Sequence, residues 1–217
     1  MRERKIKARY ARGGSNKYLV EMLNEGLVEY ILDGQTFDLF GVTSLRENPR
    51  HVSTSPFTSY NYHSKGNFAS LVDVVVLGAT EVDVNFNANV VTHSDGRMLH
   101  GIGGWQNCLF SKCTILPIPA FRDRIPVIID RVTTICGPGE LIDVIVTERG
   151  IAVNPLRTDL RDKLRGSSLP IRDIREIKEE VEDICRKPDL PNVGEQVVAV
   201  VKWVDGTVID SVWKVES

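Results

Sequence analysis

The sequence predicts an α/β fold: an open, mostly parallel sheet flanked by helices and followed by a C-terminal β-hairpin. Unbroken apolar runs indicate the sheet, because strands covered on both faces have this character. We expect such strands at Val72–Leu77, Ala88–Val91, Thr114–Ile118, Val132–Ile135 and Ile142–Val146. Glycine-bearing turns at Gly78 and at Gly101–Gly104 each follow a buried-looking strand, and open α/β sheets bind ligands at such strand ends.

The N-terminal region predicts a helix followed by a strand. Ser15 can cap this helix and Gly26 can end it. Its apolar positions share one stripe: Leu19, Met22 and Leu23. A strand at Leu27–Leu32 and a turn at Asp33-Gly34 follow, and a helical turn then ends near Pro49. We therefore expect a helix, a strand and a second helical turn, in that order, at the start of the fold.

A polar stretch separates this region from the apolar strands. Residues 50–68 are rich in Ser, Thr, Asn, Tyr and His and show no clear period. Long polar loops in compact domains are often lids or binding loops. Residues 187–194 are the one clear linker in the sequence, and we expect a single domain over residues 1–217.

The C-terminal part predicts a helix and a hairpin. Asp173–Glu176 has the character of a capping box and opens a helix. The inward positions of that helix would be Ile174, Ile177, Val181 and Ile184. Gln196–Trp203 and Val208–Val215 flank Asp205-Gly206, which predicts a hairpin with a two-residue turn.

Composition excludes several classes of protein. With 42% hydrophobic and 26% charged residues, the 217-residue chain can bury a sizeable core. The net charge of −2 gives no reason to expect nucleic acid or a membrane as partner. The four cysteines lack metal-ligand spacing, so we expect reduced thiols and no metal. Neither a signal peptide nor a spanning segment is evident, which favours a cytoplasmic protein.

Gly101-Ile-Gly-Gly104 is the first candidate site. Without Cβ atoms, glycines let a ligand approach closely and can present N–H groups to a carbonyl oxygen or phosphate. An ordinary structural turn is the competing interpretation of this short motif. The spacing does not match the dinucleotide fingerprint, because the third glycine is misplaced.

Polar side chains supply further candidates. Asn85, Asn87 and Asn89 would point the same way in an extended chain and could bind a polar ligand, although a turn-rich sheet edge would look similar. Asp38, near the end of a short apolar run, could act as a base or nucleophile, or simply cap a helix. Glu81 and Asp83 are expected to be solvated, like most acids of this kind.

The chain is similar to the citrate lyase alpha-subunit family. The resemblance spans essentially the whole chain in order and covers the second half of the family protein. The run Thr147–Pro155 (Thr-Glu-Arg-Gly-Ile-Ala-Val-Asn-Pro) is highly specific. Further matching segments are Gly26–Leu32, Ser44–His51, Leu77–Asp83, Asn85–Asn89, Ser94–Gly96, Gly101–Gly104, Asp130–Thr134, Pro138–Glu140, Val197–Val201 and Asp205–Asp210.

This resemblance implies a fold of the NagB/RpiA/CoA-transferase type. It implies exchange of the acyl group of an acetyl-[acyl-carrier protein], or of acetyl-CoA, for citrate, which gives a citryl thioester and acetate. The substrates would carry coenzyme A or a phosphopantetheine arm, and no metal would take part. Implied partners are a first-half CoA-transferase domain or subunit, the acyl carrier protein and the citrate lyase beta subunit, in an oligomeric assembly.

The resemblance also implies roles for particular residues. Related CoA-transferases use a nucleophilic glutamate, whereas the segment Gln35–Asp38 has none, so transfer is expected within a ternary complex. Asp38 would then orient groups or act as a base, beside the catalytic amides of Gly103 and Gly104. The cofactor-binding residues would be Gly78, Ala79, Asn85, Asn87, Asn89, Gly101 and Trp105.

One departure leaves alternatives open. The family usually has a run of small and polar residues after the glycine pair, beginning with His, but this chain has Trp105–Cys113. Bulky Trp105 and Phe110 would reshape the pocket, which predicts a changed acyl substrate or weaker activity. A half-domain that only binds coenzyme A, a carrier or a partner chain is the alternative. A sugar-phosphate isomerase or deaminase on the same fold would need a phosphate loop, which the sequence lacks.

Overall fold

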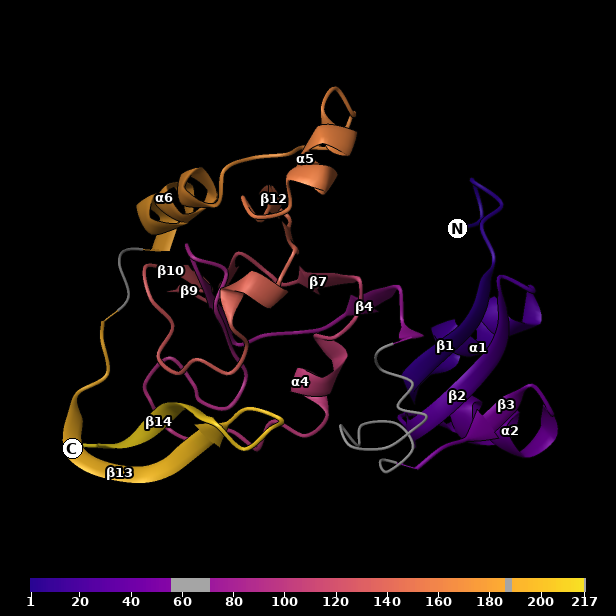
Figure 1. Cartoon of the computed structure of the whole chain (residues 1–217), viewed down its shortest axis with the longest axis horizontal. Helices are drawn as coiled ribbons and strands as arrows, with labels where there is room; N and C mark the ends of the chain where they lie inside the picture. The colour runs from indigo at the N-terminus through magenta and orange to yellow at the C-terminus, as the bar shows by residue number, and fades with distance from the viewer. Residues whose placement is uncertain (56–70, 186–188, 217) are drawn as a thin grey trace. The chain divides into compact units, whose positions relative to one another are not determined.

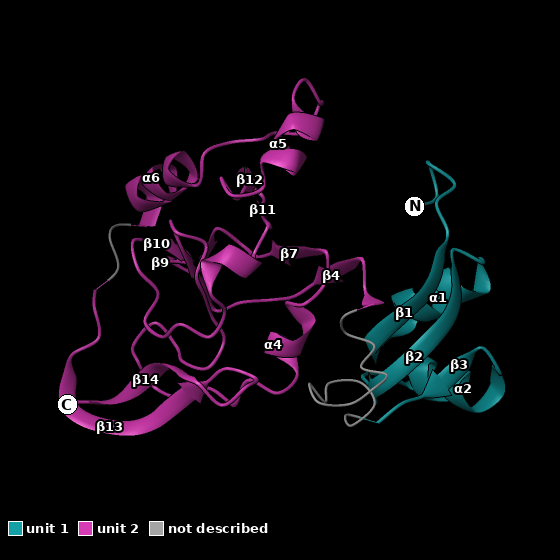
Figure 2. Ribbon diagram, viewed as in Figure 1, with its two compact units in different colours: residues 1–68 teal, residues 69–217 magenta. Residues whose placement is uncertain are grey.

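The computed structural model describes residues 1–55, 71–185 and 189–216. The chain divides into two compact units, residues 1–68 and residues 69–217 (Figure 2). The single domain over residues 1–217 stays a prediction. Most of the polar stretch 50–68, and part of the linker-like stretch 187–194, lie outside the described residues.

Unit 1 is a small α/β unit with a parallel sheet in the order β1-β2-β3 (Figure 1). Its elements are β1 (Ala8–Ser15), α1 (Lys17–Asn24), β2 (Val28–Thr36), α2 (Leu39–Glu47) and β3 (His51–Ser53). Leu23 of α1 and Val28 and Ile31 of β2 are buried. Each such side chain contributes about 1.5–3 kcal/mol when it is fully buried. The parallel pairing of β1, β2 and β3 agrees with the mostly parallel sheet that the sequence predicts.

Two local predictions in unit 1 are wrong. Asn16, not Ser15, caps α1: its side chain accepts a hydrogen bond from the Leu19 N–H, while Ser15 ends β1. Asp33-Gly34 is no turn but lies inside β2, which pairs with β1 on one side and β3 on the other. Gly26 does follow the end of α1, with a φ of +71°.

Unit 2 contains a four-stranded sheet in the order β12-β11-β7-β4. Strands β4, β7 and β11 are parallel, and β12 runs antiparallel to β11. The bounds are β4 (Val74–Val76), β7 (Cys113–Pro117), β11 (Val144–Thr147) and β12 (Gly150–Val153). Three smaller sheets accompany it, and their strands are β5 (Glu81–Asp83), β6 (Ala88–Asn89), β8 (Phe121–Arg122), β9 (Ile125–Pro126), β10 (Ile128–Ile129), β13 (Val193–Lys202) and β14 (Val208–Val215).

The part of unit 2 that the structure describes also contains helical elements. They are α4 (Trp105–Cys108), the 3-10 helix η2 (Gly139–Leu141), α5 (Thr158–Leu164) and α6 (Ile174–Cys185). The core joins α6 to the strands, and its fully buried members include Val82, Leu116, Ile128, Ile145 and Ile177. No helix among the described residues combines the length and the apolar character that crossing a membrane would need.

The structure corrects three further predictions in unit 2. Residues 132–135 form no strand; nearby, β10 spans Ile128–Ile129. Ile184 is 44% exposed rather than inward, although the other three predicted positions of α6 are buried. Val74 and Val76 of β4 are more than half exposed, so the described residues do not cover both faces of this strand.

The C-terminal hairpin is present, but its turn differs from the prediction. Strands β13 and β14 pair antiparallel. The Gly206 N–H donates to the Trp203 carbonyl, so Val204 and Asp205 are the central residues of the turn. Gly206 follows with a φ of +94°, a conformation that glycine adopts without strain.

Candidate functional site

The glycine turn leads directly into a short helix, as the sequence predicts. Gly103 has a φ of +60° and is exposed, and Gly104 is the N-cap residue of α4. The backbone before the turn is no strand; Met98 forms only an isolated bridge with Thr92. The N–H groups of Gly103 and Gly104 donate no hydrogen bond to any described residue. This turn therefore contains two main-chain donors that no described residue uses.

Trp105 ties the glycine turn to two other segments. Its indole N–H donates to the Gly78 carbonyl oxygen at 2.9 Å. Its ring lies against Gly137, where a Cβ atom would come within 2.5 Å of the indole. The next residue, Gln106, donates to the Cys136 carbonyl at 3.0 Å. The structure thus brings Gly78 and Trp105 together, and the indole fills space beside the turn as its bulk suggests.

Arg122 belongs to the same region, although no sequence pattern points to it. Its guanidinium donates to the carbonyl of Ala79 at 2.8 Å and to that of Thr80 at 2.7 Å. With Trp105 on Gly78, three consecutive carbonyl groups accept bonds from side chains. The C=O and N–H of a trans peptide point in opposite directions. The Ala79 N–H, which pairs with no described residue, therefore faces away from the indole.

The three asparagines do not form the row that an extended strand would give. The chain turns at residues 84–85, and Phe86 has a φ of +67°. The Asn87 amide donates to Asp83 and accepts from the Gly139 N–H. The buried Asn89 amide donates to Glu81 and to Thr92. These amides hold the loop together, and ligand binding by Asn85, Asn87 and Asn89 stays a prediction.

Glu81 and Asp83 are buried, contrary to the expectation that they are solvated. The Glu81 carboxylate accepts from the backbone and hydroxyl of Thr133. Asp83 accepts from the N–H groups of Asn85 and Asn87 at 2.9 and 3.0 Å. The two carboxylates thus accept hydrogen bonds from backbone N–H groups that have no partner on a neighbouring strand. Their role here is to shape the loop.

Asp38 lies in unit 1, at the carboxyl end of β2. Its carboxylate accepts from the Gly41 N–H at 2.8 Å, and this hydrogen bond caps α2. It also accepts from the N–H of Lys17, the first residue of α1, at 2.7 Å. These backbone hydrogen bonds lower the pKa of Asp38. The side chain is therefore ionised at neutral pH, and its catalytic role stays a prediction.

A buried polar network in unit 1 has no counterpart in the sequence analysis. Asp33 accepts hydrogen bonds from the hydroxyls of Ser15 and Thr36, each at 2.7 Å. Its Oδ2 also lies 3.2 Å from Nε2 of His51, whose Nδ1 is 2.9 Å from the Ser44 hydroxyl. The Asp33-Gly34 dipeptide is typical of a turn, so its sequence gives no sign of a buried carboxylate inside a strand.

The cysteines and acids provide no metal centre among the described residues. All four cysteines are free thiols. Burial raises the pKa of Cys113 and of Cys136, so neither thiol is activated as a nucleophile.

Comparisons with known proteins agree on one family. Residues 1–215 match the family described as citrate lyase, alpha subunit (CitF). The citrate lyase alpha chains of Escherichia coli and Klebsiella pneumoniae are each 38% identical over the whole chain, which covers 42% and 43% of their length. The chain thus spans less than half the length of the curated relatives that it matches.

Solved structures support the same relationship. The alpha subunit of citrate lyase from Streptococcus mutans, crystallised in complex with citrate, superposes with a TM-score of 0.95 at 39% identity. The match covers all of this chain and 43% of that one. RipA from Yersinia pestis gives a TM-score of 0.53 at 15% identity over 83% of this chain and 49% of its own. The second match shows a shared fold only.

Proposed function

The chain belongs to the citrate lyase alpha-subunit family, and from this premise we propose that it forms the second half of a citrate CoA-transferase. The substrates are an acetyl thioester, of acyl carrier protein or of coenzyme A, and citrate. The products are the citryl thioester and acetate. The support is the family match over residues 1–215, together with the glycine turn.

The chemistry needs no covalent bond to the enzyme. A citrate carboxylate attacks the acetyl thioester carbonyl, and the C–S bond breaks to give a mixed anhydride and a thiolate. The thiolate then attacks the citryl carbonyl of the anhydride, and acetate leaves. Each step passes through a tetrahedral oxyanion, so donors placed at that oxygen accelerate both steps. Holding both acyl groups in one complex supplies the remaining rate acceleration, because the reacting atoms are already positioned.

One observation carries this proposal: Gly103 and Gly104 present N–H groups without partners among the described residues. We assign these two amides to the oxyanion. Removal of one such donor typically costs about 10²–10³ in kcat. We assign thioester binding to Gly78, Ala79, Asn85, Gly101 and Trp105. Asn87 and Asn89, whose amides bond to Asp83 and Glu81, would support the loop instead.

Asp38 receives an orienting role in this proposal. Its lowered pKa keeps it ionised, which makes it a poor proton acceptor at neutral pH. A fixed negative charge can still orient the groups around a substrate. We therefore assign Asp38 to positioning rather than to proton transfer.

The proposed partners follow from the length of the relatives. Since the chain spans 42% of the Escherichia coli alpha chain, a first-half CoA-transferase domain or subunit would complete the site. The acyl carrier protein and the citrate lyase beta subunit would join it in a cytoplasmic oligomer. The beta subunit would cleave the citryl thioester.

The test combines this chain with a first-half polypeptide, acetyl-CoA and citrate. We expect release of acetate and formation of citryl-CoA, measured by mass spectrometry. Gly103→Ala should reduce the rate, because its φ of +60° is strained for alanine and the donor would shift. A folded, mixed sample without exchange would contradict the proposal.

A second candidate is a half-domain that binds coenzyme A or a carrier arm without catalysis. The position of the Trp105 indole, bonded to the Gly78 carbonyl and packed on Gly137, favours it. Calorimetry with coenzyme A separates the two functions. Binding that Gly104→Trp abolishes, without turnover, supports the half-domain; absence of binding excludes both.

A further inference from the structure

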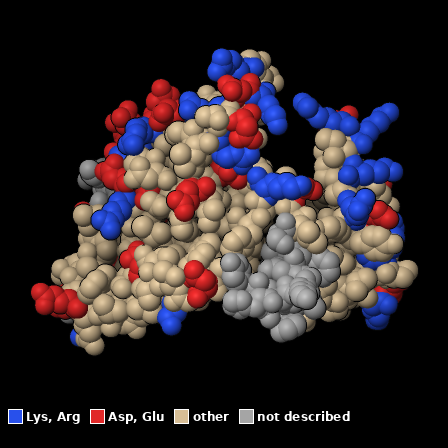
Figure 3. All heavy atoms as spheres, viewed as in Figure 1, with Lys and Arg blue, Asp and Glu red and all other residues tan. Residues whose placement is uncertain are grey.

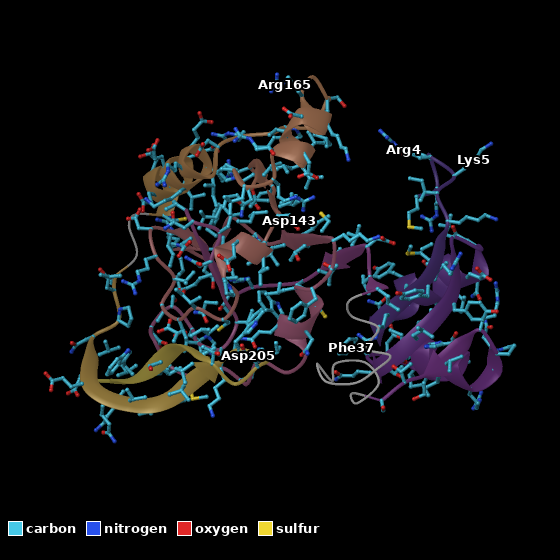
Figure 4. All side chains as sticks on the ribbon, viewed as in Figure 1. Arg4, Lys5, Phe37, Asp143, Arg165 and Asp205 are labelled. Atoms are coloured by element: carbon cyan, nitrogen blue, oxygen red, sulfur yellow. The ribbon has the colours of Figure 1, made fainter. Side chains whose placement is uncertain are left out.

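Positive charge is concentrated at one end of unit 1. Residues 1–12 contain six basic residues and one acidic residue, whereas residues 13–217 contain 21 basic and 28 acidic residues. Figure 3 shows Lys and Arg side chains gathered over this part of unit 1. Arg4 and Lys5 extend away from the ribbon in Figure 4. The net charge of −2 therefore conceals a strongly basic surface.

A cavity lies within this basic surface. Its volume is about 420 Å³, and its charged lining residues are Lys7, Arg9, Arg50 and Glu29, together with Ala8 and Gly26. None of the four charged side chains forms an ion pair with a described residue. Arg2, by contrast, pairs with Glu25 at 2.6 Å. Three cations thus share one cavity with a single carboxylate.

The cavity is remote from Asp38 within unit 1. Lys7 and Arg9 flank the start of β1, Glu29 lies near the start of β2, and Arg50 directly precedes β3. The three strands are parallel, so these residues mark the amino ends of the sheet. Asp38 follows the carboxyl end of β2. The basic cavity is therefore a separate site from the one in which Asp38 is proposed to act.

Charge and shape restrict the ligand. Three neighbouring cations repel one another, and an anion among them removes that cost. Guanidinium groups match phosphate oxygens with two parallel hydrogen bonds, and an ammonium adds a point charge. The three cations and Glu29 together carry a charge of +2, which a dianionic phosphate would neutralise. A tricarboxylate would bring three further carboxylates into a cavity that already contains Glu29.

We propose that this cavity, lined by Lys7, Arg9 and Arg50, binds the phosphate group of a small phosphorylated molecule. Phosphomonoesters and pyrophosphates are the two chemical sources of such a group. The proposal does not depend on the transferase function, because it concerns ligand binding at the amino ends of the unit 1 strands, away from Asp38. A direct binding measurement therefore tests it whether or not acyl exchange is found.

Calorimetry with inorganic pyrophosphate is the test. We expect binding to the intact chain, and about tenfold or weaker affinity for the double variant Lys7→Glu/Arg9→Glu. Glu29→Gln should tighten binding about threefold, because it removes the one carboxylate from the cavity. The matched control is Arg161→Glu/Lys163→Glu, with the same charge change on α5 of unit 2. This control should leave the affinity unchanged.

The remaining arms identify the source and can overturn the proposal. Coenzyme A compared with dephospho-coenzyme A separates phosphomonoester from pyrophosphate recognition. No binding up to about 10 mM, a very weak affinity, would overturn the proposal, as would equal losses in the control variant. Tighter binding of citrate or of a glutamate-rich peptide than of pyrophosphate would also overturn it. Circular dichroism of each variant establishes that it remains folded.

Discussion

The Nε2 atom of His51 lies 3.2 Å from the Oδ2 atom of Asp33, and both side chains are buried in unit 1. Hydrogen bonds lower the pKa of Asp33, so its carboxylate is ionised at neutral pH and can only accept, and Nε2 of His51 is the donor. The network links β1 through Ser15, β2 through Asp33 and Thr36, and β3 through His51. It therefore holds together all three parallel strands of the unit.

Asp33→Asn should lower the stability of the protein. The change removes the charge that four donors share, on Ser15, Gln35, Thr36 and His51. Hydrogen bonds to charged groups contribute about 1.5–3 kcal/mol each in favourable cases. We expect a loss of about 2–3 kcal/mol in the free energy of unfolding at pH 7, measured by urea denaturation. Asp73→Asn is the control, because its ion pair with Lys112 is exposed and should contribute little.

The same variant has a defined pH dependence. Burial alone would raise the pKa of Asp33, but hydrogen bonds from Ser15, Thr36 and Gln35 outweigh it and lower the pKa below its ordinary 3.8. A lowered pKa stabilises the fold above the unfolded value, and this stabilisation is lost as the pH falls. The difference between wild type and Asp33→Asn should therefore be constant from about pH 5 to 8 and shrink below about pH 4. An opposite trend would contradict an ionised Asp33.

The sequence predicts strands well where burial alone determines them. The apolar run Thr114–Ile118 corresponds to β7, and Leu116 within it is fully buried. The prediction fails at residues 132–135 because non-local partners replace a ladder. The N–H groups of Thr133 and Ile135 donate to the carboxylates of Glu81 and Asp210, which are distant in sequence. Hydrophobicity carries no information about such partners.

The site shows the same division. The glycine turn before α4 is predictable, because glycine spacing marks it locally. The side chains that fix its surroundings are not. Arg122 reaches Ala79 across 43 residues, and the amides of Asn87 and Asn89 are consumed by buried acids. A polar residue on a strand can bind a ligand or its own loop, and only tertiary contacts decide between them.

Gly139→Ala should be severely destabilising. A Cβ atom at Gly139 would overlap the carbonyl oxygen of Asn85, and the clash is with backbone that cannot rotate away. We expect a loss of about 3 kcal/mol or more in the free energy of unfolding, measured by urea denaturation. Gly78→Ala is the matched control, because nothing lies within 4 Å of its added methyl group. Its stability should change by less than about 0.5 kcal/mol.

A double-mutant cycle can test the packing of Trp105 on Gly137. Gly137→Ala places a methyl group within 2.5 Å of the indole and should cost about 1–3 kcal/mol. In a Trp105→His background the six-membered ring is gone, so the same change should cost little. Urea denaturation of the four proteins should give a coupling energy above about 1 kcal/mol. Additive effects would mean that the indole does not occupy this position in solution.

Asp38 can be separated into a helix cap and a functional charge. Asp38→Ser retains a capping oxygen and removes the charge, whereas Asp38→Ala removes both. If the charge orients the substrate, both variants should lose acyl exchange, and only Asp38→Ala should also destabilise α2. The lowered pKa keeps the carboxylate ionised above its ordinary 3.8, so the wild-type exchange rate should show no Asp38 titration between about pH 5 and 8. Rates measured across this range, with circular dichroism of each variant, distinguish the roles: full activity of Asp38→Ser would leave Asp38 with the cap alone.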